Sequence, residues 1–157
     1  MANYYEQFSK ILPLDAKNPK ELEWWQKVLA TQNDHGQEGP IDVMETGFDI
    51  KITEDPPSVW LYCDQEGSDS GQAAEAIHQF LKHFDLPDII TISVACWCSK
   101  PWVDEQSGHI HVISKEGWES GHLWTLGADI EKAIKDGRPK PQQKPLDQTG
   151  PDDPGAR

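Results

Sequence analysis

Two pairs of potential metal ligands lie close together in the sequence. Cys96 and Cys98 form a Cys-x-Cys pattern, and His109 and His111 form a His-x-His pattern after a short loop. Thiolate and imidazole are ligands that tetrahedral zinc accepts, and neighbouring strands can bring two of each kind together. One hypothesis is therefore a zinc site made of these four residues, which requires Cys98 to lie opposite His109.

The alternation of side chains along the first segment favours buried cysteines instead. In DIITISVACWC, residues 88–98, Cys96 and Cys98 share one strand face with Ile92 and Val94. Successive residues of a strand point to opposite faces, and cysteine is often buried. The pattern thus predicts that both thiols point into the core with the aliphatic side chains.

The second segment, HIHVIS, predicts the opposite orientation for the imidazoles. Ile110 and Val112 are suited to the core face, which sends His109 and His111 to the other face. A shifted register or a β-bulge would restore the zinc site. The histidines are therefore expected on the face that does not carry the cysteines.

Two other kinds of chemistry are disfavoured. DQEGSDSGQAAE, residues 64–75, has acids at the first, third and twelfth positions of a calcium loop, but Asp69 stands where that loop needs glycine, so helix capping explains it better.

Cysteine catalysis needs an accessible thiolate in an electropositive setting, which core cysteines in an acidic chain lack. No spacing identifies a catalytic residue, so the sequence favours a protein that is not an enzyme and carries no cofactor, and leaves a hydrolase open as a third alternative.

The hydrophobic pattern predicts alternating strands and helices. Strands are expected at 4–12, 47–53, 59–63, 88–98 and 109–114, and helices at 19–31, 69–84 and 127–136. Asn18 and Asp69 are suited to cap the first two helices, with Gln72 in the capping-box position. The order predicts an α+β fold, a mostly antiparallel sheet with two main helices on one face, in a ferredoxin-like βαββαβ arrangement with an added C-terminal strand and helix.

The sheet face without helices is expected to carry large aromatic residues. The polar and aromatic residues assigned to it are Lys51, Trp60, Tyr62, Ser93, Trp97, His109 and His111. A contiguous aromatic patch is costly to leave in water. It is expected to be covered by residues 117–135 of the same chain, by a protein partner, or by a second copy in a homodimer.

The charge is strongly negative and unevenly distributed. The chain of 157 residues has a formal charge of −13, and residues 33–75 hold eleven acids and one base. Such a field repels phosphate, so direct nucleic-acid binding is disfavoured. The segment is either a solvated face or a surface that attracts a basic partner, including by imitating DNA. The candidate contacts within it are Asp34, Glu38, Asp42 and Glu45.

Composition also predicts the domain organisation. Residues 1–136 are expected to form one domain, because a chain of this size buries roughly 70% of its unfolded surface. Residues 137–157 contain five prolines and little apolar surface, which predicts a disordered tail. Three cysteines make no disulfide framework, and neither a signal peptide nor a membrane span is visible, so a cytoplasmic location is expected.

Three stretches carry a resemblance to a known group of proteins. VWLYCDQEG, AAEAIHQFLKHF and CSKPWVDEQSGHIHVIS, within residues 59–115, resemble small uncharacterised proteins of bacterial plasmids and phages. The resemblance implies a mobile-element setting and supplies no activity. In those proteins small residues stand where this chain has His109 and His111.

These patterns together favour a non-catalytic, acidic protein-binding module from a phage or plasmid. It would engage a partner through residues 33–75, through the aromatic sheet face, or through both. The alternatives are a zinc-binding protein that uses Cys96, Cys98, His109 and His111, and a DNA-mimicking inhibitor of a nucleic-acid-binding protein.

Overall fold

The computed structural model describes residues 4–33, 39–41, 47–63, 68–98 and 107–122, together with Lys132 and Asp136. The chain divides into two units, Met1–Leu123 and Trp124–Arg157, and the helices and strands named below lie in the first. The predicted tail at 137–157 lies outside the described residues, and so does the predicted helix at 127–136 apart from Lys132 and Asp136.

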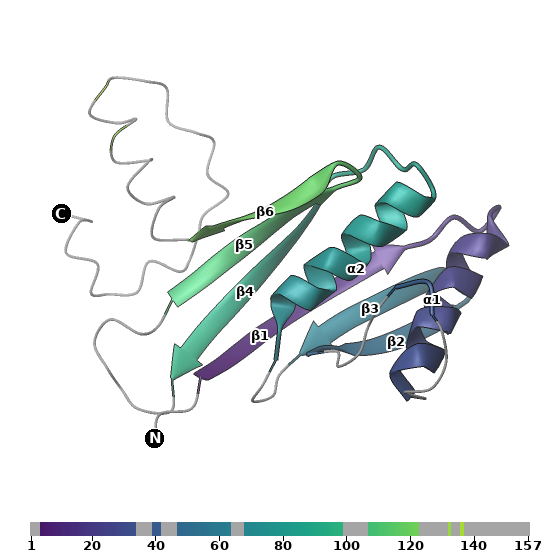
Figure 1. The fold of residues 1–157 in the computed structure, drawn as a ribbon, viewed down its shortest axis with the longest axis horizontal. Coiled ribbons are helices and arrows are strands. Elements are labelled where there is room, and N and C mark those ends of the chain that lie inside the picture. Colours follow the sequence, from purple (N-terminus) through teal and green to yellow (C-terminus); the bar gives the residue numbers. More distant parts are fainter. Residues whose placement is uncertain are drawn as a thin grey trace. The chain divides into compact units, whose positions relative to one another are not determined.

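The first unit is an α+β fold built on one antiparallel sheet (Figure 1). In chain order its elements are β1 (Tyr4–Pro13), α1 (Pro19–Asn33), β2 (Asp49–Glu54), β3 (Pro57–Cys63), α2 (Ser70–His83), β4 (Ile90–Cys98), β5 (Ser107–Ser114) and β6 (Gly117–His122). The strand order is β2-β3-β1-β4-β5-β6, and each pair of neighbours is antiparallel. The predicted α+β class is confirmed. The strand predicted after the βαββαβ elements corresponds to β5, but the exact predicted order is not matched, because β6 follows β5 and extends the sheet further.

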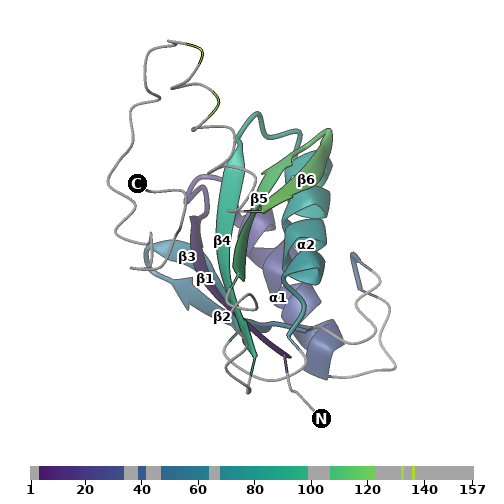
Figure 2. The same cartoon turned by 90° about the vertical axis from the view of Figure 1, so that its left-hand side faces the viewer.

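Both helices lie on the same face of the sheet, as Figure 2 shows. Helix α1 packs on β2 and β3, whereas α2 packs on β1, β4, β5 and β6. The other face of the sheet is therefore left without a helix among the elements that the structure describes. The two faces define the two candidate sites considered below.

The start of α1 follows from the residues before it. Glu21 is buried, and its carboxylate accepts hydrogen bonds from Asp15 N at 2.9 Å and from Asn18 Nδ2 at 3.3 Å. Pro19 occupies the first helical position, where its missing N–H costs nothing. Trp25 of this helix is completely buried in the core, and its ring packs near Phe80 of the second helix.

Helix α2 begins beside the polar side chains of the helix-facing site. The carboxylate of Asp69 accepts hydrogen bonds from Gly71 N at 2.9 Å and Gln72 N at 3.2 Å, so the predicted cap is confirmed. The Gln72 side chain does not complete a capping box, because its Oε1 accepts a hydrogen bond from Gly47 N instead. The first residue of α2, Ser70, is buried directly after this cap.

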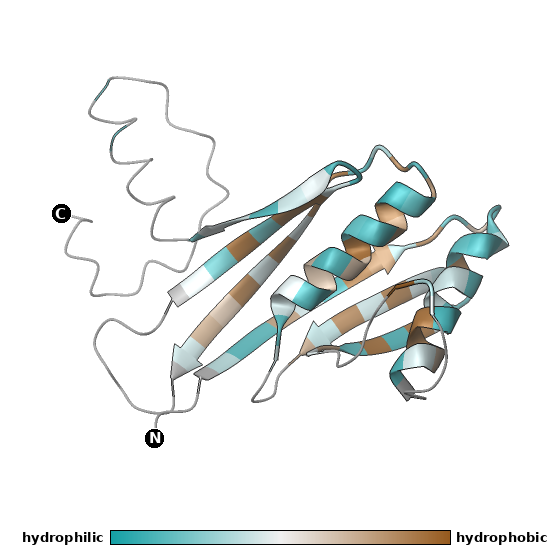
Figure 3. Cartoon of the chain, viewed as in Figure 1, coloured by the Kyte–Doolittle hydropathy of each residue, from teal (hydrophilic) through white to brown (hydrophobic). Residues whose placement is uncertain are grey.

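The hydrophobic core lies between the helices and the sheet. Figure 3 shows hydrophobic residues alternating with hydrophilic ones along the strands. The buried hydrophobic strand residues are Phe8, Leu12, Ile50, Val59, Leu61, Cys63, Ile92, Val94 and Ile113. Full burial of one such aliphatic side chain contributes about 1.5–3 kcal/mol, so this layer fixes which face of each strand points toward the helices.

The orientation of β5 differs from the prediction. Ile113 is fully buried, whereas Val112 is 47% exposed and Ile110 is partly buried. The prediction followed the alternation that contains two apolar residues, Ile110 and Val112, and not the one that contains only Ile113. Because side chains alternate along a strand, this difference of one position moves every residue of β5 to the other face.

Residues 117–122 do not cover the aromatic sheet face. They form β6, which pairs with β5 at the edge of the sheet, and the Trp118 indole donates a hydrogen bond to Glu75 of α2 at 2.8 Å. The rest of the predicted cover lies outside the described residues apart from Lys132. Neither α1 nor α2 is long and apolar enough to cross a membrane, and the described residues contain no other helix that is.

Candidate functional site

The face opposite the helices carries an aromatic surface. Trp60 and Tyr62 alternate along β3 with residues that are buried in the core, so their side chains point away from the helices. Their rings stack at a centroid distance of 4.3 Å and an interplanar angle of 30°. Trp97 of β4 stacks on Tyr5 of β1 at 5.6 Å and 13°. Three predicted aromatic residues thus lie on this face, together with Tyr5, which the sequence pattern did not single out.

The two stacked pairs lie along β1, which contributes Tyr5 and pairs with the strands that carry Trp97, Trp60 and Tyr62. Ile11 lies opposite Trp60 in the β1–β3 register and is 62% exposed. From Tyr5 to Ile11 the strand covers about 20 Å at its usual rise. The Trp60 indole donates a hydrogen bond to Ser9 Oγ at 2.8 Å, which fixes the orientation of its ring. We call Tyr5, Ile11, Trp60, Tyr62 and Trp97 the aromatic face.

His111 lies on the other side of the sheet, contrary to the prediction. It pairs with Ile92 in the β4–β5 register and is 4% exposed. Its Nε2 is 2.8 Å from Ser70 Oγ, and its Nδ1 is 2.6 Å from Ser120 Oγ. Both ring nitrogens have partners, which removes the main cost of burying them. Burial lowers the pKa of His111, and the neighbouring His109 lowers it further.

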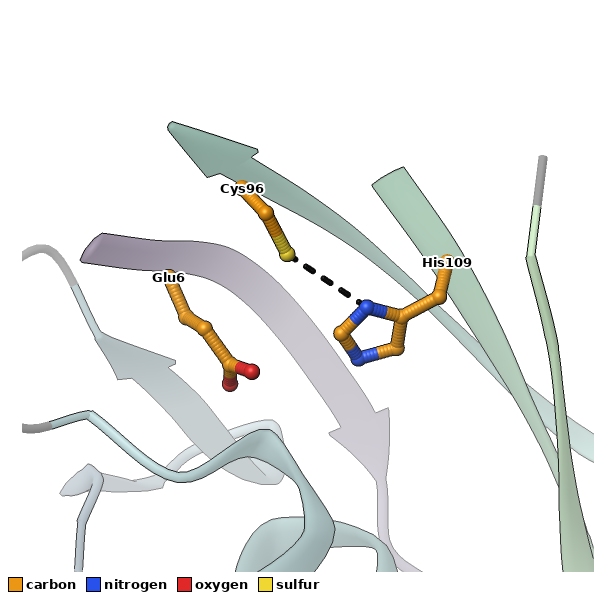
Figure 4. A group of neighbouring side chains, drawn as sticks. All are labelled: Glu6, Cys96 and His109. Atoms are coloured by element: carbon orange, nitrogen blue, oxygen red, sulfur yellow. Dashed lines mark hydrogen bonds between the residues drawn. The ribbon is translucent and has the colours of Figure 1, made fainter. Parts of the chain in front are cut away.

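His109 also faces the helices, beside Cys96. Its Nδ1 is 3.4 Å from Cys96 Sγ (Figure 4). Its Nε2 is 3.1 Å from Ser70 Oγ. Burial lowers the pKa of His109, whereas burial and the charge of Glu6 raise the pKa of the Cys96 thiol. Both shifts favour a neutral thiol next to a neutral imidazole. Burial thus disfavours the thiolate that a cysteine nucleophile needs.

Glu6 of β1 completes a group of three potential ligands. It lies directly opposite Cys96 in the β1–β4 register, and its Oε2 accepts a hydrogen bond from Ser70 N at 2.8 Å. One ligand atom from each of Glu6, Cys96 and His109 lies within 4.8 Å of the other two. Figure 4 shows the three side chains converging from three neighbouring strands. We call these residues the Glu-Cys-His cluster.

The predicted zinc set is only partly brought together. The register places His109 opposite Val94, not opposite Cys98 as the hypothesis required. His111 has both ring nitrogens engaged by serines, and for Cys98 only the backbone is described. Cys96 and His109 do converge, because both lie on the helix-facing side.

Glu6 and Ser70 were missed because polar residues were not expected among core positions. One signal for Glu6 is present in the sequence. It shares its strand alternation with Phe8 and Leu12, which are both buried. No comparable pattern identifies Ser70, which becomes important only because α2 begins against β1 and β5.

The acidic candidates lie outside the described residues. This applies to Asp34, Glu38, Asp42 and Glu45. The acids of the same segment that the structure describes are all exposed: Asp49, Glu54, Asp55, Asp69 and Glu75. Among them, Asp69 caps α2, and Glu75 accepts hydrogen bonds from Gln79 and Trp118 that lower its pKa.

The chain matches no protein-family model, no curated protein and no solved structure. Functional inference therefore depends on the two sets of residues described above.

Proposed function

We propose that the protein is a non-catalytic protein-binding module that holds its partner against the aromatic face. The observation that carries this proposal is the pair of aromatic stacks on a sheet face opposite both helices, with Ile11 exposed beside them. Trp and Tyr dominate the energetics of protein interfaces because they bury a large area with few rotatable bonds. A surface already fixed by stacking loses little entropy when a partner binds.

Charge supports a protein partner over a nucleic acid. Residues 1–123 contain twenty-one acids and eight bases, whereas residues 124–157 contain six of each. The whole charge of −13 therefore belongs to the unit that carries the aromatic face. Aromatic side chains on a sheet also stack on RNA bases, but RNA-binding sheets normally add a basic field. A basic protein surface is the complementary partner, and a nucleic-acid-binding protein that the acidic segment would inhibit by imitating DNA is one such partner.

Site-specific photocrosslinking tests this proposal. A photoreactive phenylalanine analogue is placed at Ile11, on the aromatic face, and at Ile89 as the matched control, since Ile89 is 71% exposed before β4. We expect a crosslinked protein at Ile11 that is absent at Ile89, in an extract of the source cells. Trp60→Ala and Trp97→Ala should each reduce its yield several-fold, because they remove one ring of a stack.

The identity of the crosslinked product separates the possible occupants. A second copy of this chain would identify the aromatic face as a homodimer interface, which sedimentation over a range of concentrations would confirm. Charge reversal of Asp34, Glu38, Asp42 and Glu45 should lower capture if the partner is basic. Equal crosslinking from Ile11 and Ile89, or yields that neither tryptophan substitution changes, would refute the proposal.

The proposal also includes a ferredoxin-like core, a reducing compartment and a mobile-element setting. The order β2-β3-β1-β4 supports a ferredoxin-like core in the first six elements, with β5 and β6 as additions. The unpaired thiols of Cys63 and Cys96 support a reducing compartment such as the cytoplasm. The resemblance to plasmid and phage proteins supports a mobile-element setting.

A further inference from the structure

We infer that Glu6, Cys96 and His109 form a binding site for a divalent transition metal ion of the zinc class. The site lies on the helix-facing side of the sheet and is distinct from the aromatic face. Its three ligands come from β1, β4 and β5, which are adjacent in the sheet. Rigid neighbouring strands can position ligands more closely than loops can.

The distance between Cys96 and His109 fits tetrahedral coordination. Zinc binds sulfur at about 2.3 Å and imidazole nitrogen at about 2.0 Å, which places the two ligand atoms about 3.5 Å apart in a tetrahedron. Cys96 Sγ and His109 Nδ1 are 3.4 Å apart. Glu6 contributes an oxygen within 4.8 Å of both atoms, so a small rotation of its side chain brings it into range.

Ser70 provides the outer hydrogen bonds that metal ligands need. Ligating histidines usually donate their second ring N–H to a fixed partner, and ligating carboxylates are themselves hydrogen-bonded. Ser70 is 1% exposed, its N–H donates to Glu6 Oε2, and its Oγ lies 3.1 Å from His109 Nε2. With the proton of His109 on Nε2, that N–H donates to Ser70 and the Nδ1 lone pair faces Cys96. Glu6 Oε1 stays available for the metal.

The donor set selects the class of metal. A thiolate and an imidazole favour zinc and similar transition metals over magnesium and calcium, which prefer oxygen ligands. Three protein ligands leave the fourth position of a tetrahedron for water or for a group from a bound molecule. His111 lies next to His109, at a ring-centroid distance of 4.7 Å, but is held by Ser70 and Ser120. It is therefore a neighbour of the centre and not a fourth ligand.

Binding to the unmodified chain provides the first test. The full-length protein is stripped with chelator, kept reduced, and titrated with Zn²⁺ or Co²⁺. We expect one ion per chain, and with Co²⁺ the visible bands of a tetrahedral ion and the near-ultraviolet band of a cobalt–thiolate bond. Zn²⁺ should also slow alkylation of Cys96 several-fold, as read by fragmentation of the labelled peptide, and leave Cys63 unchanged. Absence of a thiolate band, or protection of Cys98 without Cys96, would overturn the inference.

Substitutions provide the second test. Cys96→Ser, His109→Gln and Glu6→Gln should each weaken Zn²⁺ binding at least tenfold. His83→Gln is the matched control, because His83 is an exposed histidine at the other end of α2. Far-UV circular dichroism of each metal-free variant checks that it folds. The protection of Cys96 from alkylation is measured on the unmodified chain and does not depend on any variant. Affinity that none of the three substitutions changes would also overturn the inference. Neither test involves the aromatic face, so its outcome is independent of the proposed function.

Discussion

Ser70 connects the polar residues of the helix-facing side through three hydrogen-bonding contacts. Its N–H reaches Glu6, and its hydroxyl lies near both His109 and His111. A hydroxyl can donate one hydrogen bond and accept two, so it can satisfy both imidazoles at once. Because buried polar groups are costly when unpaired, Ser70 and, at the other ring nitrogen, Ser120 make it possible for His111 to lie in the core.

The buried His111 predicts a pH-dependent stability for the metal-free protein. Its pKa is lowered in the folded state, so the unfolded state takes up the proton at a higher pH than the folded state does. The free energy of unfolding should therefore decrease as the pH falls below about 6.5, the ordinary histidine pKa. Urea unfolding in chelator, at several values between about pH 7 and pH 5, measures this slope.

Substitution separates the contribution of His111 from that of His109, whose pKa is also lowered by burial. His111→Gln should reduce the slope without abolishing it, because glutamine does not titrate, whereas His83→Gln at an exposed site should leave the slope unchanged. An unaltered slope in His111→Gln would show that the proton is taken up elsewhere.

The sequence predicts the orientation of some of these side chains but not of others. The positions of Trp60, Tyr62 and Trp97 followed from the apolar residues between them. Those of His109 and His111 did not, because both alternations of HIHVIS contain apolar residues. The deciding contacts come from Ser70 and Ser120, which are distant in sequence or lie on the next strand. Alternation cannot detect partners of that kind.

Helix α2 supports the Glu-Cys-His cluster, because its first residue, Ser70, contacts Glu6 and His109. The cap at Asp69 holds the first turn, and the backbone N–H of Asp69 also donates to Gly47 O at 2.8 Å. The start of the helix is thereby tied to the segment before β2. Loss of the cap is expected to weaken the fold and to loosen the contacts of Ser70.

Asp69→Ala should lower the free energy of unfolding by about 1 kcal/mol, the usual cost of losing a helix cap. Asp69→Asn should restore most of the loss, since asparagine caps helices as well as aspartate does. Asp88→Ala, at an exposed position beyond the helix, is the matched control. Chemical denaturation measures all three. A loss in Asp69→Asn as large as in Asp69→Ala would mean that charge, and not capping geometry, is what matters.

The helices and most strands could be predicted because local signals agree with their burial. Asn18 and Pro19 mark the start of α1, and the buried stripe of α2 repeats at helical spacing. Strand β6 could not be predicted in this way, because GWESGH has only one large apolar residue. It forms through backbone pairing with β5, which depends on the rest of the sheet being in place.

At the scale of the whole molecule, the named helices and strands and both candidate sites fall within residues 1–123. We therefore expect a chain that ends at Leu123 to fold, with the far-UV spectrum of helices and strands and a melting temperature within a few degrees of the full-length value. It should keep the full negative charge and bind Zn²⁺ with unchanged affinity. Calorimetry and metal titration check this prediction, and an unfolded product would show that residues 124–157 are needed for stability.

The central place of β1 affects how the protein folds during synthesis. This strand precedes both of its partners, β3 and β4, by long stretches of chain, yet it lies between them in the sheet. On the ribosome it must wait unpaired until each partner emerges, and contacts so distant in sequence slow folding. We therefore expect that chaperones can bind the nascent chain until Ile90–Cys98 has left the exit tunnel.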